Sequence, residues 1–155
     1  MMNKYDQQLR QYMQDHHIEG EHLVFSQSCH SVAEAAAAVG ASPSDLVKNI
    51  CMLDTQGNAI IAIVKGEDRV SMSRVAKALQ IERPRTAEPE EILDKTGYPC
   101  GGTPSFGYAA RFLIDPKVME KDIVYTGGGS EYALVRMSAQ ELIRANQGRV
   151  VRIRS

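Results

Sequence analysis

The chain has few of the features that mark secreted, metal-binding or membrane proteins. It contains only 3 cysteines, at positions 29, 51 and 100, and no Cys-x-x-Cys pair. This odd number and this spacing exclude a disulfide framework and a structural zinc site, so we expect free thiols, no metal and no cofactor. No apolar run is long enough to span a bilayer, and residues 1–6 lack the apolar segment of a secretion signal. The sequence therefore predicts a cytoplasmic protein with no membrane partner.

The chain also lacks a large excess of either charge. Its formal net charge is −1, with 18 basic side chains against 19 acidic ones. Long stretches of nucleic acid are held by strongly basic proteins that release counterions, so DNA is not an expected partner, and any RNA should be contacted over a small footprint. A chain of 155 residues with 43% hydrophobic and 24% charged side chains is ordinary for one globular unit. Residues 1–155 are therefore predicted to form a single domain.

Helix and strand patterns alternate irregularly along the chain. Helices are predicted over residues 3–15, 32–39, 71–79, 89–96 and 139–147. Strands are predicted over residues 22–25, 47–53, 59–64, 110–114, 123–125, 133–135 and 150–153. Ser31 and Ser138 each precede a glutamate by three residues, which predicts capping boxes, and Gly40, Gly97 and Gly148 are placed to end helices. The order, with a central hairpin of strands 47–53 and 59–64, favours an α+β or mixed α/β fold over a doubly wound parallel sheet.

Lys48 is the first side chain that could carry chemistry. It is a lone cation at the start of a strand whose following residues are largely apolar. Its ammonium could neutralise charge on an ester or phosphate oxygen in a partly desolvated pocket. An exposed lysine at a strand end fits the same pattern and is more common, so the residues alone favour that simpler interpretation.

The loop of residues 98–107 is the second candidate, because it holds three glycines and two prolines. Without a Cβ, Gly101 and Gly102 would let a carbonyl oxygen approach backbone amides closely, as an oxyanion hole requires. A structural turn accounts for the same residues equally well.

Other features give weaker signals. The run Gly127-Gly128-Gly129-Ser130 could cradle an oxyanion or a phosphate, but it lacks the lysine and serine of a Walker loop, so a wide turn is favoured. Cys29 and His30 are adjacent in sequence and do not generally face each other, so no catalytic pair is predicted there. A solvated basic face is favoured over an RNA contact for the C-terminal arginines, which are Arg144, Arg149, Arg152 and Arg154.

The motifs resemble, in order, those of the YbaK and prolyl-tRNA synthetase-associated editing-domain family. They are Ser31-Val32-Ala33-Glu34-Ala35-Ala36, Gly40, Leu46-Val47-Lys48-Asn49-Ile50 and Gly97-Tyr98-Pro99-Cys100-Gly101-Gly102-Thr103-Pro104-Ser105-Phe106-Gly107. The resemblance spans roughly residues 22 to 146. It implies a mixed, partly barrel-like sheet flanked by helices, with a pocket for the acceptor end of tRNA that carries an amino acid. The implied reaction is hydrolysis of the ester of a mischarged tRNA.

The resemblance also implies roles for particular residues. Lys48 would be the electrostatic anchor, and Gly101 and Gly102 would donate amide hydrogen bonds to the aminoacyl carbonyl. The pocket would be shaped by Asn49, Thr103 and Pro104. From the residues alone, Gly127, Gly128, Gly129 and Ser130 are further candidates for substrate binding. Water, or a hydroxyl or thiol of the substrate, would be the nucleophile, which fits the absence of a Ser/His/Asp or Cys/His arrangement.

One departure from the family bears on specificity. Some relatives carry an aspartate or a histidine just beyond the second glycine loop, where this chain has Tyr132-Ala133-Leu134. The expected substrate is tRNA for proline, and the amino acid stays open between alanine, cysteine and another small residue. An aminoacyl-tRNA synthetase is a further candidate partner. The alternatives are a non-catalytic module that binds aminoacyl-tRNA, a nucleotide or a protein, and a thiol enzyme that uses Cys100.

Overall fold

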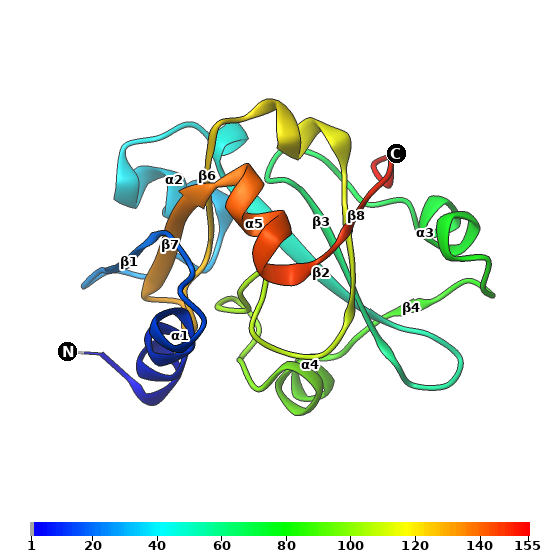
Figure 1. The fold of residues 1–155 in the computed structure, drawn as a ribbon, viewed down its shortest axis with the longest axis horizontal. Helices are drawn as coiled ribbons and strands as arrows, with labels where there is room; N and C mark the ends of the chain where they lie inside the picture. Colours follow the sequence, from blue (N-terminus) through cyan, green and yellow to red (C-terminus); the bar gives the residue numbers. More distant parts are fainter. Residues whose placement is uncertain (1) are drawn as a thin grey trace.

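A computed structural model describes residues 2–155 of the chain (Figure 1). Its helices are α1 (Lys4–Asp15), α2 (Val32–Val39), α3 (Met72–Leu79), α4 (Pro89–Thr96) and α5 (Ala139–Asn146), with short 3-10 helices at Pro43–Asp45 and Pro116–Glu120. Its strands are β1 (Glu21–Val24), β2 (Val47–Leu53), β3 (Ala59–Lys65), β4 (Arg85–Thr86), β5 (Arg111–Ile114), β6 (Ile123–Gly127), β7 (Ala133–Ser138) and β8 (Arg149–Val150). None of these helices is long and apolar enough to cross a membrane.

The strands form two sheets. One has the order β4-β2-β3-β5-β8 and the other has the order β1-β7-β6. β2 and β3 form the predicted antiparallel hairpin near the centre of the larger sheet, while β5 runs parallel to both β3 and β8. A single bridge between Leu46 and Tyr125 connects the two sheets. The α+β fold is confirmed, but within residues 2–155 the sheets do not close into a barrel, because the edge strands β4 and β8 have only two residues each.

β3 is the centre of the core because both of its faces are covered. Successive side chains of a strand point to opposite faces. Ile61 and Ile63 pack in a cluster with side chains of α1, α4 and α5, whereas Ile60 and Ala62 pack with Val75 of α3 and with the C-terminal segment. All four β3 side chains are fully buried. Figure 1 shows α5 in front of this hairpin and α3 at its right.

Most helix ends lie where the local signals place them. Ser31 forms both halves of the capping box with Glu34 at the start of α2. Gly40 and Gly97 end α2 and α4 with φ angles of 66° and 81°, in the left-handed region that glycine tolerates. These contacts lie within one turn of the helix end, which is why the sequence alone predicts them.

The predictions for α5 are partly wrong. Ser138 caps the helix by accepting the N–H of Glu141 at 3.0 Å. The carboxylate of Glu141 does not return to the cap and instead accepts the backbone N–H of Glu19 at 2.7 Å. The helix ends at Gln147, which has a φ of 57°, one residue before the predicted Gly148. The Glu141 carboxylate points away from the cap because Glu19, which follows α1, lies next to it. No local sequence pattern reveals this contact.

The last predicted strand, residues 150–153, is shorter than expected. β8 ends at Val150 because the buried carboxylate of Asp115 then takes over the backbone hydrogen bonds. Its Oδ1 accepts the N–H groups of Ile153 and Arg154 at 2.9 and 3.1 Å. The Ile153 carbonyl in turn accepts the N–H of Ser71, the N-cap of α3, at 2.7 Å. The C-terminal segment is therefore hydrogen-bonded both to Asp115, at the end of β5, and to the start of α3.

Candidate active site

A small cavity of about 180 Å³ lies where α2, the start of β2, and the loops after α4 and β6 meet. Five of the predicted site residues line it, namely Lys48, Asn49, Gly101, Thr103 and Gly127. Apolar side chains form much of the remaining wall, including Val32, Ala35, Leu46 and Leu134. The volume is below the roughly 300 Å³ at which pockets for larger ligands begin, so the cavity fits a small group.

Lys48 brings an uncompensated charge to this cavity. Its side chain is half-buried, and within residues 2–155 its ammonium forms no ion pair and no hydrogen bond. Burial, together with the positive charge of Arg69, lowers the pKa of Lys48, and the opposing effect of Asp68 is smaller. A cation that is partly desolvated and has no protein partner is suited to an anionic ligand or to a developing oxyanion.

Asn49 fixes the loops around the cavity. Its Nδ2 donates to the carbonyl of Thr103 at 2.9 Å and to Oγ1 of Thr126 at 3.1 Å. Its Oδ1 accepts the hydroxyl of Ser105 at 2.7 Å. The Ser105 and Thr126 hydroxyls, both fully buried, lie 2.7 Å apart. Asn49 thus joins β2, the loop of residues 98–107 and the end of β6 into one hydrogen-bonded unit.

The two adjacent glycines have different roles. Gly101 lines the cavity with a φ of 91°, and within residues 2–155 its N–H meets no hydrogen-bond acceptor. A Cβ at Gly101 would collide with the ring of His30. The N–H of Gly102 donates to the Pro99 carbonyl at 3.1 Å, and a Cβ there would collide with the backbone of Ser130. The expectation of two available amides is therefore corrected to one, because the Gly102 amide closes a turn.

The second glycine loop is mainly structural. Gly127 lines the cavity, but the lining does not include Gly128, Gly129 or Ser130. The Gly128 N–H donates within its own turn at 3.0 Å, and the Gly129 N–H donates to the Gly102 carbonyl at 2.8 Å. Ser130 Oγ accepts a backbone N–H of the same turn at 3.1 Å. These three residues form a wide turn, which is the simpler of the two interpretations of the sequence. Their hydrogen bonds also connect the two glycine loops.

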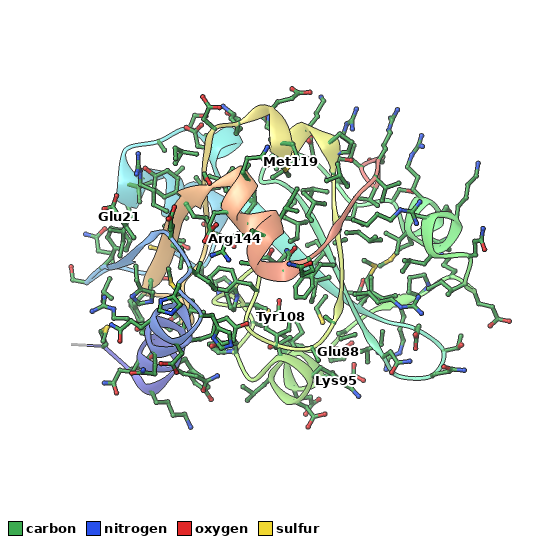
Figure 2. The ribbon with its side chains drawn as sticks, in the orientation of Figure 1. Glu21, Glu88, Lys95, Tyr108, Met119 and Arg144 are labelled. Carbon is green, nitrogen blue, oxygen red and sulfur yellow. The ribbon has the colours of Figure 1, made fainter. Side chains whose placement is uncertain are left out.

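Pro104 also lies outside the cavity lining. It is buried, and its carbonyl accepts the hydroxyl of Tyr108 at 2.6 Å. Tyr108, labelled in Figure 2, is partly buried and packs against the core cluster that contains Ile92 of α4 and Leu142 of α5. Pro104 thus acts on the cavity only indirectly, by fixing the course of the loop.

Sequence reasoning missed His30. This residue lines the cavity beside Gly101, and its Nδ1 lies 3.7 Å from the carboxylate of Glu131. The sequence predicts no catalytic pair of Cys29 and His30. Both residues line the cavity, but the Cys29 side chain is buried in a small apolar cluster. The partner of the imidazole is 101 positions away in the sequence, so no spacing pattern indicates it.

The cysteines and the possible metal ligands give little support for a thiol enzyme or a metal site. Cys100 is exposed and lines the cavity. Cys51 is buried, and burial raises its pKa to about 11, which disfavours the reactive thiolate. Within residues 2–155, no group of three or more His, Cys, Asp and Glu side chains could hold a metal ion.

Comparison with known sequences gives a family match over most of the chain. Residues 26–145 match the family model of the aminoacyl-tRNA editing domain. The chain is 23% identical over 126 residues to the uncharacterised protein YwhH of Bacillus subtilis strain 168, covering 80% of each chain. It is 26% identical over 109 residues to the proline–tRNA ligase of Syntrophus aciditrophicus strain SB. That match covers 70% of this chain but only 19% of the ligase.

Comparison with solved structures supports the fold. A crystal structure of a candidate trans-editing enzyme for prolyl tRNA synthetase superposes with a TM-score of 0.91 and 23% identity, covering 100% of this chain and 99% of the other. The family match includes Lys48, Gly101 and Gly127, and the structure brings these three residues to one cavity. This chain belongs to the aminoacyl-tRNA editing domain family.

Proposed function

We propose that this protein is an aminoacyl-tRNA deacylase that hydrolyses the ester of mischarged tRNA, most specifically tRNA for proline that carries a small wrong amino acid. One observation carries the proposal. Lys48, whose ammonium has no partner within residues 2–155, and Gly101, whose N–H has none there either, line the same cavity of about 180 Å³. On this proposal residues 1–155 act as one editing domain in the cytoplasm, and a proline–tRNA ligase is the candidate partner, since such a ligase contains a matching segment.

The chemistry follows from the charge that develops during ester hydrolysis. A water oxygen, or a hydroxyl or thiol of the substrate, attacks the aminoacyl carbonyl, and negative charge moves to the carbonyl oxygen. On this proposal the Gly101 N–H would donate to that oxygen, and Lys48 would neutralise the oxyanion or the phosphate of the terminal nucleotide. The ester C–O bond then breaks, the ribose hydroxyl of the tRNA takes up a proton, and with water as nucleophile the free amino acid is released.

Cavity size supports a small substrate side chain. A wall that includes Val32, Ala35 and Leu134 surrounds a volume of about 180 Å³, which leaves little room beyond a short aliphatic or thiol side chain. A pocket of this kind excludes larger residues by steric clash, which is how editing sites discriminate. Alanine and cysteine are therefore the proposed amino acids.

The test is a panel of mischarged tRNAs incubated with the purified protein. We expect deacylation of tRNA for proline that carries alanine or cysteine, and a loss of about 100-fold or more in Lys48→Ala. Lys95→Ala is the matched control, since Lys95 is exposed at the end of α4, and should retain full activity. Absence of deacylation with every tRNA, or full activity in Lys48→Ala, would contradict the proposal.

A second candidate is a non-catalytic module that binds aminoacyl-tRNA. The specific observation in its favour is that the Gly102 amide is used in a turn and is not available to an oxyanion. Retention of charged tRNA that depends on Lys48 but gives no turnover would favour this candidate. The thiol alternative predicts that alkylation of Cys100 abolishes activity.

A further inference from the structure

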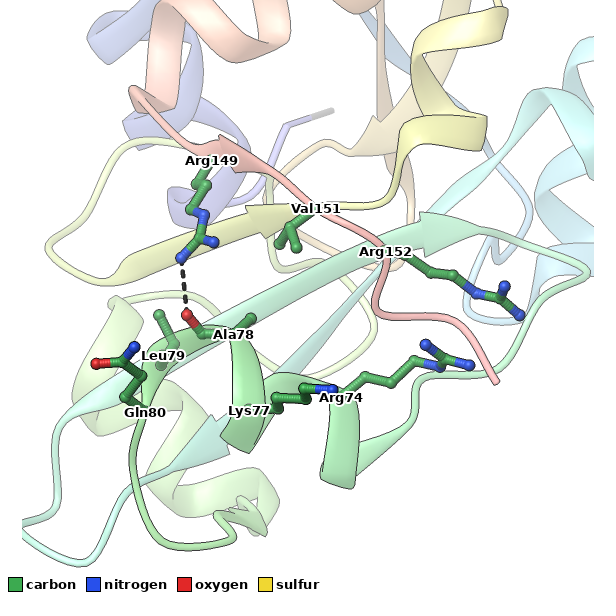
Figure 3. Close-up of a pocket in the computed structure, with 8 residues that line it drawn as sticks. All are labelled: Arg74, Lys77, Ala78, Leu79, Gln80, Arg149, Val151 and Arg152. Carbon is green, nitrogen blue, oxygen red and sulfur yellow. Dashed lines mark hydrogen bonds between the residues drawn. The ribbon is translucent and has the colours of Figure 1, made fainter.

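A second, larger cavity of about 670 Å³ lies between α3 and the C-terminal segment, and it shares no lining residue with the Lys48 cavity. We call it the basic groove (Figure 3). It is lined by Arg74, Lys77, Ala78, Leu79, Gln80, Arg149, Val151 and Arg152. Four of these eight residues are cations and none is acidic.

The charge of the basic groove is not balanced by the protein. Within residues 2–155, none of Arg74, Lys77, Arg149 and Arg152 forms an ion pair, and all four are exposed. Other arginines of this chain do have carboxylate partners, namely Arg85, Arg136, Arg144 and Arg154. Four cations without a carboxylate partner thus line one groove of a chain whose net charge is −1. Such a concentration attracts an anion with several charges.

The groove is built from two segments that only the fold brings together. Arg74 and Lys77 lie three residues apart and so share one face of α3. Arg149 donates from Nη1 to the Ala78 carbonyl at 2.7 Å, which joins β8 to the end of α3 and covers a carbonyl that would repel an anion. Figure 3 shows Arg74 and Arg152 extending toward the same end of the groove, with Arg149 at the other end.

The groove and Lys48 are on the same face of the larger sheet. Strand alternation places Lys48 on the side of β2 that also carries Ile50 and Met52. Ile50 and Met52 pack in the cluster that contains Val75 of α3 and the C-terminal segment. With a rise of about 3.3 Å per residue, Met52 lies about 13 Å along the strand from Lys48.

Arg69 is near both sites. Its charge is close enough to lower the pKa of Lys48, and its carbonyl accepts the N–H of Ser155 at 2.9 Å, next to the segment that carries Arg152. A polyanion that extends from the Lys48 cavity to the groove would therefore meet a further positive charge near both sites.

We propose that the basic groove binds backbone phosphates of the tRNA whose acceptor end enters the Lys48 cavity. This inference rests on the proposed function of that cavity. Guanidinium groups match the geometry of phosphate oxygens, and three of the four cations are arginines. The groove lining has no aromatic side chain of the kind that anchors protein partners, which favours RNA over an acidic protein. Phosphate contacts would position the tRNA without reading its sequence.

The experiment measures binding of uncharged tRNA to the full chain over a series of salt concentrations. The test variant is Arg74→Gln/Arg152→Gln, and the control is Lys4→Gln/Lys95→Gln, which removes the same charge from exposed positions on α1 and α4. We expect the test variant to lose affinity by roughly ten- to a hundredfold near 0.1 M salt, and the slope of log K against log salt to fall by about 1.5. The control should bind within about twofold of the wild type.

A second measurement separates this inference from the proposed function. Deacylation of a short aminoacylated RNA that contains only the acceptor end should be unchanged in Arg74→Gln/Arg152→Gln and lost in Lys48→Ala. A wild-type protein that deacylates nothing, with tRNA binding still lost in the groove variant, refutes the proposed function and leaves the RNA contact standing. Equal tRNA affinity and salt slope in wild type and groove variant refute the RNA contact, and so does an equal loss in the control. The RNA contact is also refuted if the groove variant loses only the binding of a purified proline–tRNA ligase.

Discussion

Replacement of Asn49 by alanine is the most informative single change, because this side chain makes three hydrogen bonds around the cavity. The lost bonds are those to the Thr103 carbonyl, to Thr126 and from Ser105, at 2.9, 3.1 and 2.7 Å. A buried group left without its partner costs about 1–3 kcal/mol. The Ser105 and Thr126 hydroxyls keep each other as partners, so the main loss falls on the Thr103 carbonyl. We expect the free energy of unfolding to fall by about 2–4 kcal/mol.

Urea unfolding measures this loss directly. With the usual dependence of about 1–3 kcal/mol per M, the midpoint should fall by about 0.7–4 M. Deacylation should fall as well, because the loop that carries Gly101 loses its tether. Asn58→Ala is the matched control, since Asn58 is exposed in the turn between β2 and β3 and bonds only to Asp54, and it should cost about 0.5 kcal/mol or less.

A double-mutant cycle decides whether the network is the cause. Thr126→Val removes a fully buried hydroxyl that accepts from Asn49 while keeping the shape of the side chain. Combined with Asn49→Ala, it should show a coupling of about 1 kcal/mol or more. A loss below about 0.5 kcal/mol in Asn49→Ala, or strict additivity of the two changes, would show that the reasoning is wrong.

Further predictions concern pH and the glycines. Burial lowers the pKa of Lys48, so the deacylation rate, corrected for spontaneous ester hydrolysis, should decline at a pH below the pKa of an ordinary lysine. Lys48→Arg should remove this alkaline decline. Gly101→Ala should block the cavity by displacing His30, and adding His30→Ala should restore part of the activity. Gly102→Ala should prevent stable folding, as seen by circular dichroism, because its Cβ would meet rigid backbone. Burial alone raises the pKa of Asp115, but backbone amides and a guanidinium lower it below the ordinary value. The stabilisation from ionised Asp115 is therefore present above the unfolded pKa of about 3.9 and is lost as the pH falls through the lower folded pKa. Urea unfolding of Asp115→Asn should show no such change of the free energy of unfolding with pH.

The sequence alone determined most of the local structure and part of the site. Ser31 and Gly40 predicted the ends of α2, because a cap satisfies backbone groups within a single turn. The antiparallel hairpin that contains Lys48 was predicted, because a short connection with a turn signal joins its two strands. The family motifs then selected Lys48 and Gly101, which the structure places on one cavity, although their activity stays a prediction.

The tertiary structure alone decided which side chains meet across the fold. Asn49 bonds to Thr126, a residue 77 positions away, and Arg152 lies beside Arg74 in the basic groove. No local pattern carries this information, because such contacts depend on how the whole chain packs and not on the spacing of neighbours. The packing of the whole chain also decides that the Gly102 amide closes a turn and that His30 lines the cavity. Local signals act over one helical turn or one hairpin, whereas the site and the groove exist only once strands and loops from distant parts of the chain have packed together.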